Sequence, residues 1–174
     1  MSGNIWRYDI YDLRKFYPRS IDAFLDIGGC VGTTSVLFKS IDPFAHVVAV
    51  EACKENFIQM QQIAAPWGIK CHNLALGDGA PMCFDKKGQQ GAHCFYSEKE
   101  KQWWPKNSYT IESKSFPEIF NFCKIPKSGR YIVKIDCEGG ERFVLYDNKA
   151  IELLKGAVQI NIELHKGFGG SLED

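Results

Sequence analysis

The chain has 174 residues, of which 45% are hydrophobic and 24% are charged, and its formal net charge is zero. These values are typical of a soluble globular protein, and the balanced charge gives no basis for a nucleic acid or an anionic membrane as partner. No apolar run reaches the roughly 18 residues of a transmembrane helix. We therefore expect a single domain over residues 1–174 and no membrane partner.

The cysteines and histidines indicate neither a disulfide framework nor a zinc site. The seven cysteines are an odd number without a C-x-x-C pair, and the four histidines lack zinc-ligand spacing with them. The N-terminus also lacks the apolar core of a signal peptide. These features predict a cytoplasmic protein with reduced cysteines and no metal site built on them.

The first part of the chain alternates strand and helix signals. Residues 4–19 mix aromatic and charged side chains, which predicts a short helix over one sheet edge, ended by Pro18. A buried strand at residues 23–27 leads into a glycine turn and a helix, with Thr33 or Thr34 as its cap. A second buried strand follows at residues 47–50, and the spacing of residues 56–65 predicts a helix that stops at Pro66.

The middle and last parts continue this alternation around an insert. A third strand is expected at residues 69–76, and residues 81–130 read as a polar hairpin or loop insert with a strand near 109–111 and a helix at 117–123. A fourth strand at residues 131–136 precedes helical segments from Gly140 and at 151–154, and a fifth strand spans 158–164. Such βαβ units predict a mainly parallel sheet with helices on both faces, in which ligands bind at the carboxyl ends of the strands.

The glycine turn after the first strand indicates a nucleoside cofactor. Gly28, Gly29 and Gly32 would let the backbone approach a ligand closely, but a dinucleotide fingerprint also needs glycine where Ile27 stands. Glu51, roughly 20 residues past the turn, is placed to accept hydrogen bonds from ribose hydroxyls. The alternative is a tight turn that binds nothing.

The acidic residues favour a cationic cofactor. Asp26, inside the first strand, would repel a pyrophosphate but suits S-adenosylmethionine, which carries an ammonium and a sulfonium. With Glu51, Asp136 and Glu163 it is expected at the carboxyl edge of the sheet, so four segments deliver acids to one rim. No metal site is evident in the sequence, although clustered acids of this kind can hold a magnesium ion.

With these segments in place, the chain resembles the FkbM-type S-adenosylmethionine-dependent methyltransferases. Three blocks carry the resemblance: Leu25-Asp-Ile-Gly-Gly-Cys-Val-Gly32 with Val50-Glu51, Asn73-Leu-Ala-Leu-Gly-Asp78, and Lys134-Ile-Asp-Cys-Glu-Gly-Gly-Glu141. The late Ile162-Glu-Leu-His165 is similar to the family's E-x-H strand. The resemblance implies a Rossmann-like class I methyltransferase fold and methyl transfer to a hydroxyl of a sugar or other small-molecule or glycan acceptor.

The resemblance also marks where this chain is short. Family members usually continue past the E-x-H strand, whereas this sequence stops at Asp174. The fold is therefore expected to be shortened after strand five, with a homodimer as a candidate cover for the exposed sheet edge. The alternative function is a non-catalytic S-adenosylmethionine-binding module or fragment that needs a partner.

Cofactor binding is assigned to the three blocks. Asn73 or Asp78 is expected near the adenine amine, on an apolar shelf that includes Ala75, and the alternative is a plain turn with an Asx hydrogen bond. The full set of expected cofactor residues is Asp26, Gly28, Gly29, Gly32, Glu51, Ala52, Asn73, Ala75, Asp78 and Asp136.

Catalysis is assigned to the ends of the last two strands. Lys134 and Asp136 share one strand face, and Asp136 is the strongest candidate to bind the acceptor hydroxyl or the cofactor amine. Glu163 and His165 share another face, and His165 has the intrinsic pKa of a general base. The alternatives are an ion pair for Lys134, a structural role for His165, and a favourable helix-dipole position for Glu141.

The insert is expected on the acceptor side of the site. Trp103 and Trp104 can stack on a sugar ring or a base, and neighbouring lysines can contact phosphates, which is the weaker case for a nucleic-acid acceptor. The alternative is a solvated loop whose two tryptophans pack on the core.

Overall fold

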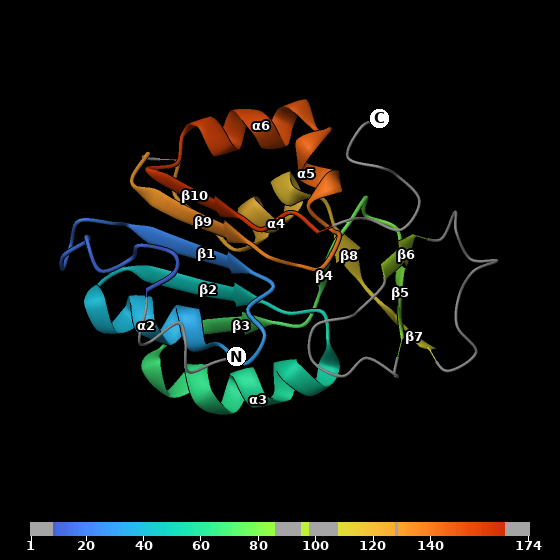
Figure 1. Cartoon of the computed structure of the whole chain (residues 1–174), viewed down its shortest axis with the longest axis horizontal. Helices are drawn as coiled ribbons and strands as arrows, with labels where there is room; N and C mark the ends of the chain where they lie inside the picture. The colour runs from blue at the N-terminus through green and yellow to red at the C-terminus, as the bar shows by residue number, and fades with distance from the viewer. Residues whose placement is uncertain (1–8, 86–94, 98–107, 128, 166–174) are drawn as a thin grey trace.

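A parallel five-stranded sheet forms the centre of the computed structural model, which describes residues 9–85, 95–97, 108–127 and 129–165. The strand order is β10-β9-β1-β2-β3, so the direction of winding reverses at β1 (Figure 1). The strands are β1 Ala23–Ile27, β2 His46–Val50, β3 Lys70–His72, β9 Tyr131–Ile135 and β10 Gln159–Ile162. The predicted parallel α/β sheet is confirmed, and its topological switch point lies between the neighbouring strands β1 and β9.

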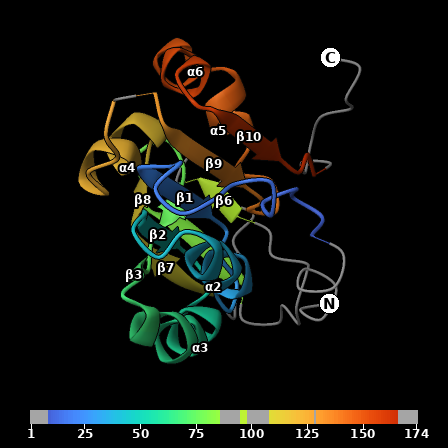
Figure 2. The same ribbon diagram turned by 90° about the vertical axis from the view of Figure 1, so that its left-hand side faces the viewer.

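Helices cover both faces of this sheet, as predicted. The helices α2 (Thr33–Ile41) and α3 (Lys54–Ala64) lie on one face. On the other face lie α4 (Phe116–Phe122), the short α5 (Arg142–Leu145) and α6 (Asn148–Lys155), as Figure 2 shows edge-on. The N-cap of α2 is Gly32 rather than the predicted Thr33 or Thr34, because the chain enters the helix from a left-handed glycine.

Alternating side chains of the sheet feed two apolar cores. Leu25 and Val133 belong to the core under α4 and α6, whereas Phe24 and Ile132 belong to the core under α2 and α3. Because both faces are covered, all five residues of β1 are buried, including the charged Asp26. A buried charge in the central strand requires a partner, which the site described below supplies.

The predicted strand at residues 69–76 is wrong as a single element. It breaks after β3, and β4 (Ala75–Leu76) pairs instead with β8 (Ser113–Lys114) in a separate two-stranded sheet. The break lies at Asn73, whose side-chain amide donates to the carbonyls of Glu51 (2.8 Å) and Ala52 (3.1 Å). These bonds fasten the linking segment to the end of β2.

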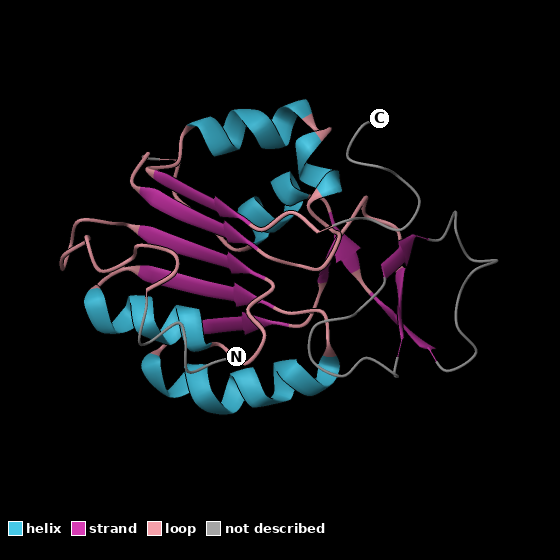
Figure 3. Ribbon diagram, viewed as in Figure 1, coloured by secondary structure: helices cyan, strands magenta, loops and turns pink. Residues whose placement is uncertain are grey.

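The insert contains a small antiparallel sheet beside the carboxyl edge. Its strands are β5 (Met82–Asp85), β6 (Phe95–Ser97) and β7 (Ser108–Ile111), in the order β6-β5-β7. Figure 3 shows the arrowheads of the central strands pointing toward it. The insert is less polar than the sequence suggested, because Met82 and Phe84 are buried.

The described part of the predicted N-terminal helix is wrong. Residues 9–19 form successive turns, because the Asp9 carboxylate accepts hydrogen bonds from the backbone of Leu13 and Arg14 at 2.9 and 2.8 Å. Such local bonds compete with helix formation. Leu13 is nevertheless fully buried and packs into the core under α2 and α3.

Among the described residues, no helix combines the length and the apolar character that are required to cross a bilayer.

Candidate functional site

The glycine turn after β1 packs against the protein itself. Gly28 and Gly29 donate their N–H groups to the Val50 carbonyl at 2.9 and 3.0 Å, which joins the turn to the end of β2. A Cβ on Gly28 would lie 1.7 Å from the Asp136 carbonyl oxygen, and one on Gly29 would lie 3.0 Å from Met60 Sδ. Close packing of the chain is therefore enough to explain these two glycines, and their contact with a cofactor stays a prediction.

Gly32 has the same kind of explanation. Its φ is +86°, and a Cβ there would lie 3.1 Å from the side chains of Ala64 and Met60 on α3. Glycine thus lets α2 start against α3. Cys30 itself is exposed and has a φ of +50°.

Glu51 follows β2 and binds the glycine turn directly. Its Oε2 accepts from the Cys30 N–H at 2.8 Å and its Oε1 from the Cys53 N–H at 2.7 Å, while the residue is only 8% exposed. Burial raises the pKa of Glu51 to about 7, against the lowering effect of the two N–H donors. An ionised carboxylate has about four acceptor positions, so acceptor capacity remains for hydroxyl groups.

Asp26 lies beneath the rim rather than at it. It is 0% exposed, its Oδ2 accepts from Ser35 Oγ at 2.7 Å, and its Oδ1 lies 3.1 Å from Lys134 Nζ. The predicted direct contact with a cofactor is corrected, because both carboxylate oxygens face protein groups. Asp26 instead balances the charge of a buried lysine.

Lys134 is that lysine, and its amino group holds three acceptors together. Besides Asp26, Nζ donates to the Gly28 carbonyl at 3.0 Å and lies 3.5 Å from Asp136 Oδ2. Burial alone would lower the pKa of Lys134, but Asp26 and Asp136 raise it overall. A lysine with a raised pKa is a poor base, so the geometry favours the ion-pair alternative, and a catalytic role for Lys134 stays a prediction.

Lys134→Met should destabilise the protein by about 3–5 kcal/mol, because it leaves Asp26 charged, buried and unpaired. Thermal unfolding would measure this as a drop of roughly 6–20 °C. The double variant Asp26→Asn, Lys134→Met removes both charges and should recover at least half of the loss. Equal stabilities of single and double variants would show that the pair does not act as a unit.

Asp136 follows β9 and is presented to the rim with a fixed orientation. Tyr11 Oη donates to its Oδ2 at 3.2 Å, and Lys134 lies near the same oxygen. The other oxygen, Oδ1, lies 3.8 Å from His165 Nε2, and the side chain is 25% exposed. Asp136 is therefore an accessible carboxylate with one oxygen held and one directed at its neighbours.

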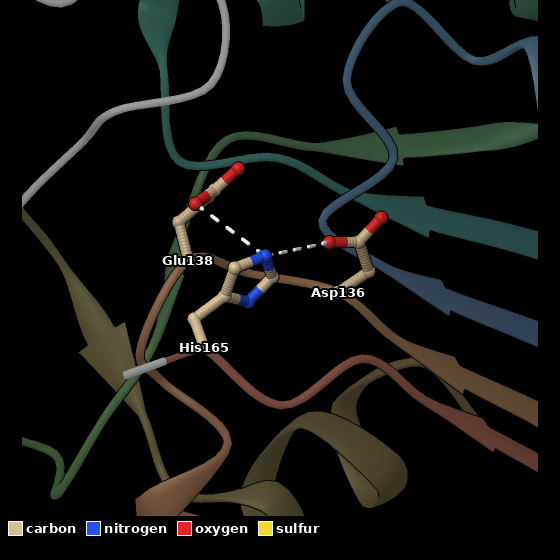
Figure 4. A group of neighbouring side chains, drawn as sticks. All are labelled: Asp136, Glu138 and His165. Atoms are coloured by element: carbon tan, nitrogen blue, oxygen red, sulfur yellow. Dashed lines mark ion pairs between the residues drawn. The ribbon is translucent and has the colours of Figure 1, made fainter. Parts of the chain in front are cut away.

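His165 is surrounded by acids. Its Nδ1 lies 3.2 Å from Glu141 Oε1, while its Nε2 lies 3.5 Å from Glu138 Oε2 and 3.7 Å from Glu163 Oε1 (Figure 4 shows the ring between Asp136 and Glu138). Burial lowers the pKa of His165, but the hydrogen bond that its ring donates to Glu141 and the charge of Glu138 raise it overall. A raised pKa makes the ring a weaker candidate for the general base, so Asp136 is the better candidate for that role.

Glu141 holds the turn that carries Glu138. It is 3% exposed, and its carboxylate accepts from the N–H groups of Cys137 and Gly139, both at 2.9 Å. The predicted helix-dipole explanation is therefore incomplete, because these donors precede the helix α5. Glu138 lies in the turn, as expected, with a left-handed φ of +55°.

The predicted adenine segment has structural partners. The amide N–H groups of Asn73 are occupied by the two carbonyls that fasten β3 to β2. Asp78 is exposed and accepts from the Ala80 N–H at 3.0 Å, which is the Asx-type bond of the alternative interpretation. Ala75 is buried on the core of the insert, and Ala52 packs against the same core, beside Glu51.

Two residues of the site were not predicted from the sequence, and several predicted residues of the insert lie outside the ranges that the structure describes. Tyr11 and Ser35 complete the network around Asp136 and Asp26, yet no local pattern marks them as site residues. Trp103 and Trp104, and the lysines of the insert, lie outside the described residues. Tyr109 of β7 connects the insert to the site, since its Oη accepts from the Lys54 N–H at 2.9 Å.

The chain matches no protein-family model, and no curated protein matches it.

The ion pairs that the structure describes at this rim join five carboxylates to two groups that can be positive, Lys134 and His165. Such an excess of negative charge disfavours a phosphate ligand and favours cations or hydroxyl donors.

Proposed function

We propose that the protein is an S-adenosylmethionine-dependent methyltransferase that methylates a hydroxyl oxygen of a sugar or other small molecule. The observation that carries this proposal is Glu51, a buried acid that follows β2 and is hydrogen-bonded to the glycine turn after β1. A carboxylate at this position of a doubly wound sheet is placed for the two hydroxyls of a ribose. The resemblance to FkbM-type methyltransferases, with a Rossmann-like class I fold, points to the same cofactor.

The charge of the rim supports a sulfonium cofactor over a dinucleotide. The turn has Ile27 where the dinucleotide fingerprint has its first glycine. Asp26 is neutralised by Lys134 and so repels a pyrophosphate less than the sequence suggested, but Asp136, Glu138 and Glu163 provide negative charge at the surface. A cofactor with an ammonium and a sulfonium suits this surface, whereas a pyrophosphate does not.

The chemical requirement for the protein is modest. A hydroxyl that accepts a methyl group must lie in line with the donor bond and lose its proton to a base. Asp136 offers the free oxygen Oδ1 at the carboxyl end of β9, with its orientation fixed through Oδ2. S-adenosylmethionine would supply the electrophilic methyl group, and the residues that follow β1 and β2 would hold its nucleoside.

Calorimetric titration of S-adenosylmethionine and S-adenosylhomocysteine into the purified chain tests the proposal. We expect micromolar binding that Glu51→Gln weakens by about 10- to 100-fold, since hydrogen bonds to a charged group contribute roughly 1.5–3 kcal/mol. Glu152→Gln, which changes an exposed acid of α6, is the matched control and should bind normally. A folded chain that binds neither compound would refute the proposal, and binding without transfer to any hydroxylated acceptor would favour a non-catalytic module.

The affinity should also depend on pH through Glu51. Because its pKa in the free protein is about 7, ribose hydroxyls must compete with a proton at lower pH. Affinity should therefore be constant above pH 7 and fall by up to about tenfold per pH unit below it. Titrations between pH 5.5 and pH 8.5, with Glu51→Gln as a pH-insensitive reference, measure this; equal slopes in both proteins would exclude Glu51 as the group responsible.

A further inference from the structure

Three side chains at the rim bring potential metal ligands into one small volume. Oxygens of Asp136 and Glu138 and a nitrogen of His165 all lie within 4.8 Å of one another (Figure 4). His165 Nε2 lies 3.8 Å from Asp136 Oδ1 and 3.5 Å from Glu138 Oε2. Ligands about 2.1 Å from one ion are roughly 3.0–3.5 Å apart, so the two pairs that include His165 need shifts of only a few tenths of an ångström. The oxygens of Asp136 and Glu138, which lie within 4.8 Å of each other, would move together by up to about an ångström.

The imidazole is oriented as a metal-bound imidazole usually is. Its Nδ1 faces Glu141 Oε1 at 3.2 Å, which leaves Nε2 directed at Asp136 and Glu138. Glu141 is itself buried and fixed by the N–H groups of Cys137 and Gly139. A carboxylate that accepts from the second ring nitrogen is the common support of a histidine ligand.

The two carboxylate ligands are also positioned by groups outside the cluster. Tyr11 holds Asp136 Oδ2, so Oδ1 is the oxygen left for the cluster. Glu138 lies in the turn whose N–H groups bind the Glu141 carboxylate. Its backbone has a left-handed conformation although the residue is not glycine. Three ligands therefore converge from the turn after β9 and the segment after β10, each with a defined support.

We propose that Asp136 Oδ1, Glu138 Oε2 and His165 Nε2 bind one divalent transition-metal ion. Mixed nitrogen and oxygen ligands favour ions such as Mn²⁺, Fe²⁺ or Zn²⁺, whereas Mg²⁺ and Ca²⁺ prefer oxygen alone. Glu163, whose Oε1 lies 3.7 Å from His165 Nε2, adds negative charge beside the site. Three protein ligands leave coordination positions open for water or for a hydroxyl of a ligand.

This metal site does not depend on methyl transfer, because the ion needs only these three side chains. If the proposed function also holds, an acceptor hydroxyl bound to the ion would lose its proton more easily, and in the metal-bound protein Asp136 would act as a ligand of that ion in place of the base. The competing explanation is a protonated His165 that only forms ion pairs with its acidic neighbours.

Titration of Mn²⁺ into the EDTA-treated full chain, followed by the electron paramagnetic resonance signal of free Mn²⁺, separates the two explanations. We expect one site per chain, weakened at least tenfold in His165→Gln and in Glu138→Gln. Glu152→Gln should bind as the unmodified chain does. Thermal melts of each variant check that it is folded, and Glu138 is exposed enough for its substitution to be tolerated.

A folded chain that binds no Mn²⁺ in this titration would overturn the metal site. Binding that survives both substitutions unchanged would do the same, because the ion would then lie elsewhere. Calorimetry with S-adenosylhomocysteine on the same samples reports the cofactor site separately, since Glu51 and the glycine turn contain none of the three ligands.

Discussion

Asp136→Asn should reduce turnover by about 10²- to 10⁴-fold while cofactor affinity stays within about twofold, since a positioned base contributes on that scale. The amide keeps the shape of the side chain and a carbonyl oxygen for the hydrogen bond from Tyr11. It cannot take a proton from an acceptor hydroxyl. Release of S-adenosylhomocysteine with a panel of hydroxylated acceptors measures turnover, and calorimetry on the same sample measures affinity.

The contrast between these two readouts makes the Asp136 prediction specific. A loss of both would indicate that the substitution disturbs Lys134, which lies 3.5 Å from Asp136 Oδ2, and so the turn beside Gly28. Turnover that survives the substitution would exclude Asp136 as the base and leave Glu138 and Glu163 as the candidate bases.

Gly28→Ala should destabilise the protein by more than about 4 kcal/mol, or prevent folding, because two effects act together. The residue has a φ of +79°, and the new Cβ would lie 1.7 Å from the backbone oxygen of Asp136. The clash involves the ends of two central strands, which cannot separate without breaking sheet hydrogen bonds. Chemical denaturation followed by circular dichroism measures the free energy of unfolding.

Gly68→Ala is the matched control for this substitution. Gly68 has a φ of +72°, but nothing lies within 4 Å of the position its Cβ would take. Only the left-handed conformation is then penalised, at about 1–2 kcal/mol. Similar losses at both positions would show that the contact between the glycine turn and the end of β9 is not tight.

The sequence predicted those elements whose signal is local. The strands β1, β2 and β9 are short apolar runs bounded by turn residues, and α4 begins at Phe116, one residue before the predicted start at Pro117, so each was placed within about one or two residues. The position of Glu51 beside the glycine turn also followed from spacing, because a parallel βαβ unit brings the ends of its strands to one edge.

The features that were missed depend on contacts between distant residues. The role of Asp26 required Lys134 on a neighbouring strand in register with it, and the role of Lys134 required burial that its residue type disfavours. Tyr11 reaches Asp136 across 125 positions of the chain, so no spacing rule could pair them. The break between β3 and β4 was missed because Asn73 is a single turn-forming residue without a glycine or proline beside it, and the bonds that fix it reach back to Glu51 and Ala52.

The pairing of β1 with β9 also determines how the site comes together during folding. Ala23 pairs with Tyr131, so the centre of the sheet joins residues more than a hundred positions apart. Closing so long a loop has a large entropic cost, and contacts of this range slow folding. The units around β1, β2 and β3 can form early and carry Glu51. Asp136, Glu138 and His165 meet that half only when β9 docks, so the rim assembles in a late folding step.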